Sequence, residues 1–317
     1  MNEIDIDKNL TCVNSVFEQP WWLDAVAQGR WQSIEINSGG KTTARLPYVL
    51  YKRFGFKIIG MPPNTQTLGI YFEDTGAKLS NKLGRQKDLI FAIIDQLPER
   101  CNVDIALDHR CLYVMPFIWK GFKIQPCFSY RIENLNDLDE IWNGFRANIR
   151  TDIRKAEKIL HICDDLSINA LIKMQRKTFQ RQGRSIKGHS EILIQLDKAA
   201  RTHDARKLIC AVDGDGNIHA AGYFVYDERN CYYLIGGGDP EFRNSGAGSL
   251  VLWEGIKFAS TVSEAFDFEG SMIEDIERFF RAFGGKPTVY YRVTKLNPLL
   301  SLLDYMKPRI KKIIGYK

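Results

Sequence analysis

The stretch from Asn230 to Glu269 constrains the fold most, because it places a glycine-rich loop between a strand and a helix. The apolar run Cys231–Ile235 predicts a strand, and Gly236–Pro240 predicts a turn. The loop Arg243–Gly248 then leads into a predicted helix over Ser249–Ala259, which is followed by a predicted strand over Phe266–Gly270. The first N–H groups of a helix lack intrahelical partners and its dipole favours an anion, so this arrangement predicts a phosphate site.

The spacing Arg-x-x-Gly-x-Gly of Arg243, Gly246 and Gly248 is neither the dinucleotide fingerprint nor the Walker loop. It resembles the acyl-CoA pyrophosphate loop of the GNAT N-acetyltransferase superfamily, although any strand-to-helix turn can carry two glycines. The resemblance implies acyl-CoA, most simply acetyl-CoA, as co-substrate, with Arg243 and the amides of residues 245–248 on the pyrophosphate and an N–H of Gly236 or Gly237 on the developing oxyanion. The cofactor-binding candidates are Gly236, Gly237, Arg243, Ser245, Gly246, Ala247 and Gly248.

Composition predicts a globular chain of two domains without a metal. The chain has 317 residues, 44% of them hydrophobic and 26% charged, and its net charge of +6 permits an anionic partner without demanding one. No signal peptide and no apolar run of about 20 residues is visible, so we expect a cytoplasmic protein. The seven cysteines form no Cys-x-x-Cys pair and the five histidines no ligand-spaced cluster, so we expect reduced cysteines and no structural metal.

The two halves of the chain repeat one order of elements. Val103–Ile105 precedes a helix, a glycine turn and a strand that ends at Tyr130–Ile132, and Phe266–Phe268 precedes the same series, which ends at Tyr291–Val293. This order predicts an α/β fold with a mixed α+β sheet, built by duplication of one GNAT-like unit. Such alternation is also common in unrelated α/β proteins. We expect domains over residues 1–135 and 136–317, the second carrying the acyl-CoA loop.

Three further stretches extend the likeness over nearly the whole chain. They are Ile59–Gly69, Asn148–Lys158, and the pair Phe266–Met272 with Phe279–Gly285. Together they resemble the Fem-type branch of tandem acetyltransferases, which contains aminoacyl-tRNA-dependent enzymes of peptidoglycan cross-bridges and acyltransferases of cell-envelope and capsule synthesis. The chain shows no heptad run for the long helical arm that tRNA-using members often carry. Its first half also lacks the Arg-x-x-Gly-x-Gly loop, which indicates one donor site, with the first half shaping the acceptor cleft.

Acyl transfer to an amine requires a way to deprotonate the ammonium. Asp267 and Glu269 lie two apart on a predicted strand and would therefore share one face, and we favour Glu269 as the general base or amine anchor. The alternative for Glu269 is a structural carboxylate that caps the next helix or pairs with Arg292. Tyr291 is a candidate acid for the leaving thiolate, although a tyrosine in a closing strand commonly belongs to the core.

Two polar groups are candidates for the acceptor. Basic residues recur every fourth position at Arg146, Arg150, Arg154 and Lys158, which predicts one basic stripe along a helix. The stripe is either a solvated face or a binding surface for a sugar nucleotide, a lipid pyrophosphate or tRNA. In the second case we expect Arg150 and Arg154 to make the contacts. The loop Met61–Gly69 is either a rigid turn or presents Asn64 and Gln66 to a polar acceptor.

The C-terminal segment Leu299–Tyr316 is apolar on one side and basic on the other. Either it packs back on the first half, or it contacts an anionic membrane where a lipid-linked acceptor would be found.

These observations favour transfer of an acyl group from acyl-CoA to a primary amine of an amino sugar or amino acid, by direct attack in a ternary complex. The alternatives are an aminoacyl-tRNA-dependent bridge transferase and a non-catalytic binding module of the same fold. The expected partner is a small or lipid-linked amine, with tRNA as the second choice and no DNA.

Overall fold

The computed structural model describes residues 10–53, 55–164, 166–181, 189–270 and 272–296, and the fold divides into two compact units. The first unit contains residues up to Cys127 together with the segment that begins at Tyr290. The second unit runs from Phe128 to Val289. The predicted C-terminal segment Leu299–Tyr316 and its membrane or packing role lie outside the described residues.

The first unit is a mixed sheet with helices. Its elements are η1 (Val16–Glu18), α1 (Pro20–Ala27), β1 (Trp31–Ser38), β2 (Lys41–Arg53), β3 (Phe56–Gly60), β4 (Tyr71–Phe72), α2 (Leu79–Gln96), β5 (Asn102–Ala106) and α3 (Met115–Trp119). Strands β1, β2 and β3 form an antiparallel meander, and β3 pairs in parallel with β5. The next strand on β5 is antiparallel and is supplied by residues 292–295 of β12 (Lys286–Lys295).

The second unit repeats this plan. Its elements are α4 (Leu138–Gly144), α5 (Ala147–Ala156), β7 (His161–Cys163), α6 (Ile168–Arg181), α7 (His189–Thr202), β8 (Arg206–Val212), β9 (Ile218–Tyr226), β10 (Asn230–Gly238), η2 (Pro240–Phe242), α8 (Ala247–Val262), β11 (Ala265–Asp267) and α9 (Glu274–Arg281). Strands β8, β9 and β10 form the meander, and β10 pairs in parallel with β11. The antiparallel strand on β11 is β6 (Lys123–Ile132), through Arg131 and Ile132.

The closing strands are therefore exchanged between the halves of the sequence. We expected each half to close on its own last strand, but β6 follows the first half and pairs with β11, whereas β12 follows the second half and pairs with β5. Side-chain contacts fix both pairings. Arg131 binds Asp267 in the second unit, and Arg292 binds Asp104 through two bonds of 2.5 and 2.6 Å in the first. The mixed α/β fold and its repeated GNAT-like plan are as predicted.

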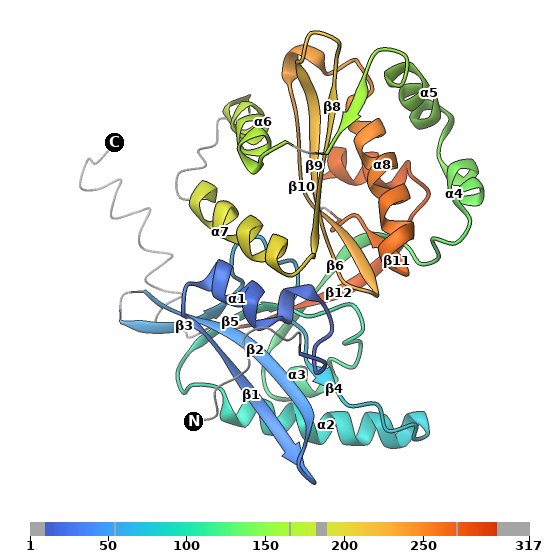
Figure 1. The fold of residues 1–317 in the computed structure, drawn as a ribbon. Helices are drawn as coiled ribbons and strands as arrows, with labels where there is room; N and C mark the ends of the chain where they lie inside the picture. The colour runs from blue at the N-terminus through green and yellow to red at the C-terminus, as the bar shows by residue number, and fades with distance from the viewer. Residues whose placement is uncertain (1–9, 54, 165, 182–188, 271, 297–317) are drawn as a thin grey trace. The chain divides into compact units, whose positions relative to one another are not determined.

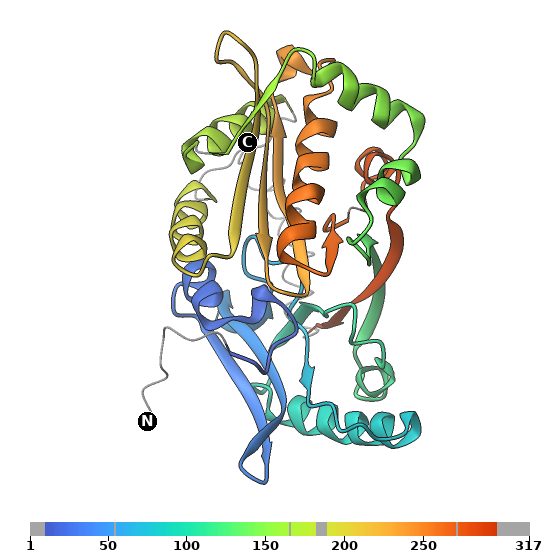
Figure 2. The same ribbon diagram turned by 45° about the vertical axis from the view of Figure 1, so that its right-hand side comes forward.

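Helices cover both faces of the second sheet. Helices α6 and α7 lie on one side of β8–β10, and α8 with α5 lies on the other (Figures 1 and 2). Between sheet and α8 lies an aromatic and aliphatic core to which α4 and α5 contribute. Helices α4 and α5 are separate, because the chain leaves the helix at Phe145. The Phe145 ring there packs on Trp142, Trp253 and Phe283, and this burial accounts for the break.

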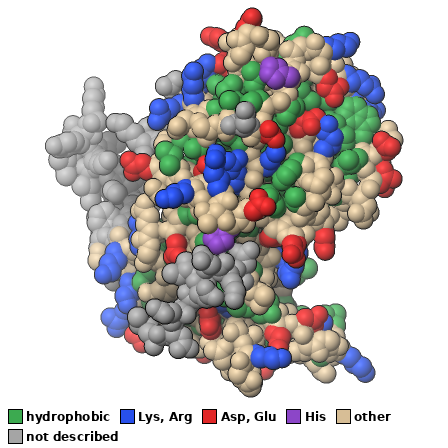
Figure 3. Space-filling view, in the orientation of Figure 1, with side chains coloured by type: hydrophobic (Ala, Val, Ile, Leu, Met, Phe, Trp, Pro, Cys, Tyr) green, Lys and Arg blue, Asp and Glu red, His purple; other side chains and the backbone are tan. Residues whose placement is uncertain are grey.

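Charged side chains are interspersed on the face seen in Figure 3, where acidic and basic groups alternate between apolar areas. In the described part of the chain, no helix combines the length and apolarity needed to cross a bilayer.

Candidate active site

The two central strands of the second unit separate partway along their length. Strand β10 pairs with β11 only from Asn230 to Tyr232, because β11 ends at Asp267. Beyond this point β10 continues to Gly238 with β9 alone, and a register shift falls between Tyr233 and Ile235. The predicted turn at Gly236–Pro240 was wrong in its first part, because all three glycines lie in β10. Among the residues that the structure describes, no strand pairs with this edge of β10 beyond Tyr232, and two cavities adjoin it.

The first cavity, here called the donor cavity, has a volume of about 380 Å³ and joins the end of β10 to the start of α8. It brings together six of the seven predicted cofactor-binding residues: Gly236, Gly237, Arg243, Ser245, Ala247 and Gly248. The seventh, Gly246, is the N-cap of α8 with φ of 80°. A side chain there would overlap the carbonyl group of Asp152, so glycine lets α8 begin against α5.

The electrostatics of the donor cavity favour an anion. Ala247 and Gly248, the first residues of α8, line it, and the first N–H groups of a helix have no intrahelical partners. The Ala247 N–H donates to Ser245 Oγ at 3.3 Å. The Arg243 side chain is exposed beside them. Backbone donors, a helix dipole and a guanidinium at one place are the groups that bind a diphosphate.

An ion pair holds the loop that carries Arg243. Asp239 caps η2 by accepting from the Glu241 N–H, and its other carboxylate oxygen binds Lys177 of α6. Burial favours a higher pKa for Asp239, but the hydrogen bonds from Lys177 and from the Glu241 N–H, together with the charge of Lys177, outweigh it and hold that pKa below its usual range. The loop is therefore anchored to the opposite helix layer.

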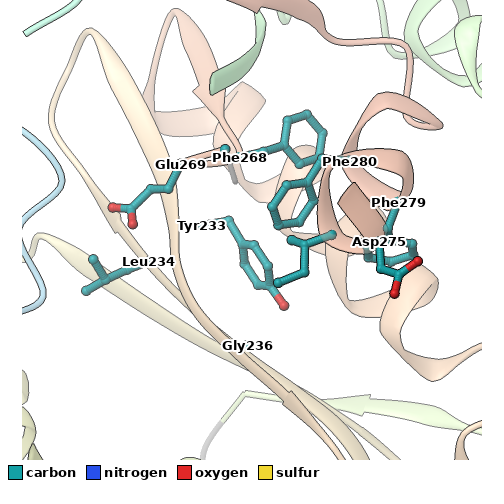
Figure 4. A pocket seen from close by; sticks show the side chains of 10 residues that line it. Tyr233, Leu234, Gly236, Phe268, Glu269, Asp275, Phe279 and Phe280 are labelled. Atoms are coloured by element: carbon teal, nitrogen blue, oxygen red, sulfur yellow. The ribbon is translucent and has the colours of Figure 1, made fainter. Parts of the chain in front are cut away.

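The second cavity, here called the aromatic cavity, has a volume of about 450 Å³ and shares four lining residues with the donor cavity: Tyr233, Gly236, Ile276 and Phe279. The Tyr233 hydroxyl lies against Gly236, where a Cβ atom would overlap it (Figure 4). Burial raises the pKa of Tyr233 to about 12, so the phenol is protonated at neutral pH. The hydroxyl thus stands at the junction of the two cavities.

Glu269 lines the aromatic cavity, but not as a strand residue. Its φ is 58°, so the chain has turned out of β11 and Glu269 does not share a strand face with Asp267 as predicted. Burial, and then the charge of Asp267, raises the pKa of Glu269 well above its ordinary value. A carboxylate with a raised pKa beside a substrate cavity can accept a proton from an amine near neutral pH.

Asp267 lines neither cavity. It is 3% exposed, accepts from Arg131 Nη1 at 2.8 Å and from the Glu269 N–H at 2.7 Å, and is hydrogen-bonded by the Ser129 hydroxyl. Its carboxylate joins β11 to β6 and holds the turn that presents Glu269. The structure therefore places it in support of the site.

Arg150 and Arg154 lie away from both cavities. Arg150 Nη1 donates to the carbonyls of Trp142, Asn143 and Phe145 at 2.6–3.4 Å, and the Arg154 guanidinium stacks 5.5 Å from the Trp142 ring. The predicted stripe does not run along one helix either, because α5 covers only Ala147–Ala156. Arg150 thus donates to carbonyls at the end of α4, and Arg154 packs on the Trp142 ring of the same helix.

The other three predicted residues belong to the first unit. Asn64 has φ of 54° in a loop whose Thr65 hydroxyl accepts from Trp22 at 2.9 Å, and Gln66 follows in the same loop. Tyr291 is a half-buried residue of β12, and its carbonyl accepts from the Leu107 N–H at 2.8 Å. These features are those of a rigid loop and a closing strand.

Sequence reasoning missed the residues that form the aromatic cavity. Sequence analysis placed Tyr233 in a predicted strand without a role and gave Ile276 and Phe279 no role, whereas all three line the space beside β10. The available signal was the amphipathic pattern of α9, in which Ile276, Phe279 and Phe280 share one side of a short charged helix.

Comparisons with known proteins concern the domain and the fold. Residues 143–271 match the model of the acetyltransferase (GNAT) domain family. The sequence has no match among curated proteins. Among solved structures the chain is similar to FemX, with a TM-score of 0.67 and 13% identity over 94% of this chain and 96% of that one.

Two further solved structures share the fold. One is a conserved protein of unknown function from Bacteroides thetaiotaomicron, with a TM-score of 0.56 and 11% identity over 87% of this chain and 90% of that one. The other is the C-terminal domain of a putative lysylphosphatidylglycerol synthetase from Agrobacterium fabrum, with a TM-score of 0.53 and 9% identity over 91% and 94%.

Proposed function

We propose that the chain is an acyltransferase of the GNAT superfamily and that it transfers an acyl group from acyl-CoA to a primary amine, because residues 143–271 match the acetyltransferase (GNAT) domain and the fold is similar to that of FemX. The observation that carries the proposal is the donor cavity, which runs from the separated edge of β10 to the N-terminus of α8 and includes Arg243. The acceptor is proposed to be an amino sugar or amino acid of envelope or polysaccharide synthesis, acylated in the cytoplasm.

Each part of the site has a task in this reaction. The α8 N-terminus and Arg243 hold the donor diphosphate, and β10 beyond Tyr232 offers backbone groups to the extended arm of the donor. An N–H near Gly236 stabilises the developing oxyanion, and Glu269 accepts a proton from the attacking ammonium. Asp267 positions Glu269 through the Glu269 N–H. The Tyr233 hydroxyl, at the junction of the cavities, is placed to donate to the leaving sulfur, a task that sequence analysis gave to Tyr291.

Titration calorimetry with acetyl-CoA and with CoA tests the donor assignment. Arg243→Glu reverses a charge at the diphosphate site, and we expect micromolar binding to fall at least about tenfold, the effect of losing one charge-assisted hydrogen bond. Lys198→Glu makes the same charge change on exposed α7 and should leave binding unchanged. If neither ligand binds the wild-type protein, the acyl-CoA proposal fails and aminoacyl-tRNA becomes the donor to test.

A further inference from the structure

The two cavities differ in the sign of their charges. The donor cavity has Arg243 and the positive end of α8, whereas the charged side chains that line the aromatic cavity are Glu269 and Asp275. Within the described part of the chain, no Lys, Arg or His lines the aromatic cavity. A phosphate group in that cavity would meet carboxylates without a compensating cation.

The surface between the two carboxylates is aromatic. Glu269 and Asp275 lie at opposite ends of the cavity in Figure 4, and the rings of Phe268, Phe280 and Tyr233 lie between them. Aromatic faces attract cations, and an aliphatic chain packs on them without leaving polar groups unpaired. The cavity therefore offers one carboxylate, an apolar span and a second carboxylate.

The geometry points to an aliphatic acceptor with two positive charges and no phosphate, such as a diamine or the free form of a basic amino acid. This inference rests on the proposed function, keeps its donor and reaction, and takes the acceptor from the aliphatic amines rather than the amino sugars. Glu269 receives the reacting ammonium beside β11, and the exposed Asp275, in the first turn of α9, binds the distal ammonium at the opposite end. The same charges select against sugar nucleotides and lipid pyrophosphates, which sequence analysis considered on the basis of Arg150 and Arg154.

The step balances with groups already named. The reacting ammonium gives one proton to Glu269, and the amine nitrogen attacks the thioester carbonyl. A C–N bond forms, the C–S bond breaks, and the sulfur leaves as a thiolate that takes a proton from Tyr233. The new amide nitrogen loses its second proton to solvent, Glu269 releases the proton that it accepted, and Tyr233 regains one from solvent. One ammonium and one thioester therefore give one amide, one thiol and one proton to solvent.

The test compares acceptors of one length with acetyl-CoA as donor. We expect kcat/KM per amino group for 1,5-diaminopentane, which has two equivalent amines, to exceed that for pentylamine by up to about fivefold, the effect of one partly exposed ion pair, and 5-aminopentyl phosphate to be the poorest. Asp275→Asn should bring the diamine-to-pentylamine ratio close to one. Glu274→Gln, the adjacent exposed carboxylate that does not line the cavity, should leave that ratio unchanged.

A comparison of acyl-CoA donors tests whether the cavity binds the acyl group or the acceptor. Calorimetry with acetyl-CoA separates failure of this inference from failure of the proposed function. If 3-aminopropanoyl-CoA outperforms butanoyl-CoA while acceptors show no charge preference, the cavity receives the acyl group and the acceptor inference is overturned. Equal rates for all three amines, no transfer to any of them, or a preference for the phosphate also overturn it while calorimetric acetyl-CoA binding keeps the donor assignment. Absence of acetyl-CoA binding instead refutes the proposed function, and this inference with it.

Discussion

Asp267→Asn should lower stability far more than it changes chemistry. Asp267 and Arg131 form an ion pair whose side chains are only 4% and 3% exposed, with Nη1 to Oδ2 at 2.8 Å. Asparagine keeps the size and one acceptor oxygen, so Ser129 and the Glu269 N–H can still donate to it. Its amide group, however, places an N–H₂ against the guanidinium and leaves a buried charge without its carboxylate.

The size of this effect follows from what Arg131 retains. Removing one partner of a buried ion pair costs about 3–5 kcal/mol, because the remaining charge stays desolvated. Arg131 still donates to Glu133 at 2.9 Å and to Asn230 at 2.7 Å, so we expect the lower end, about 3 kcal/mol. That is a large part of the stability of an ordinary domain, which is about 5–15 kcal/mol.

The assay is urea unfolding followed by tryptophan fluorescence, with kcat measured at low temperature on the folded protein. Asp215→Asn makes the same replacement in an exposed turn and should change the free energy of unfolding by less than about 0.5 kcal/mol. If Asp267→Asn unfolds with the wild-type free energy but loses kcat by a hundredfold or more, Asp267 acts on the substrate and our reasoning is wrong.

Three further predictions concern Gly246, Glu269 and Glu18. Gly246→Ala should destabilise by at least about 1 kcal/mol and weaken acetyl-CoA binding, since it adds both a left-handed strain and an overlap with Asp152; thermal melts and calorimetry measure both, and wild-type values would contradict it. Glu269→Gln should lower kcat/KM about 10²–10⁴-fold. It should also remove the rise of rate with pH, because only the deprotonated carboxylate accepts a proton and the pKa of Glu269 is raised. A variant whose rate still rises with pH excludes Glu269 as the base. Burial, and then the charge of Asp108, raises the pKa of Glu18 from 4.5 to about 7, so the folded state binds this proton more tightly than the unfolded state. The free energy of unfolding should therefore fall by on the order of 3 kcal/mol as pH rises from about 4.5 to about 7. Urea midpoints should show this slope in the wild type and lose it in Glu18→Gln.

Local signals predicted the donor loop because they depend on neighbouring residues. The Arg-x-x-Gly-x-Gly spacing located Arg243 and the start of α8, and six of the seven candidates line one cavity. The extent of β10 could not be predicted, because Gly236–Gly238 read as a turn and are held in a strand by Gly222, Ala221 and Ala220 of β9, which are distant in sequence. Tertiary pairing here overrides the weak strand preference of glycine.

Roles that depend on long-range contacts were harder to predict. Nothing near Asp267 in the sequence indicates that it binds Arg131, which is 136 residues away. Arg150 and Arg154 have the spacing of a surface stripe, but the break at Phe145 turns the chain so that they contact α4 instead. Whether a charged side chain binds substrate or stabilises the fold depends on the groups that it contacts. Those groups are set by the topology of the chain.

The exchanged closing strands have a consequence for synthesis on the ribosome. Strand β5 is translated long before residues 292–295, which form its antiparallel neighbour. Asp104 and its partner Arg292 are separated by 188 residues. The first unit therefore cannot complete its sheet until residues 292–295 have been made, and its β5 edge is open to wrong pairing until then. The second unit is in the opposite position, because β6 has already been made when β11 emerges. The later half of the gene product should thus reach its native sheet before the earlier half does.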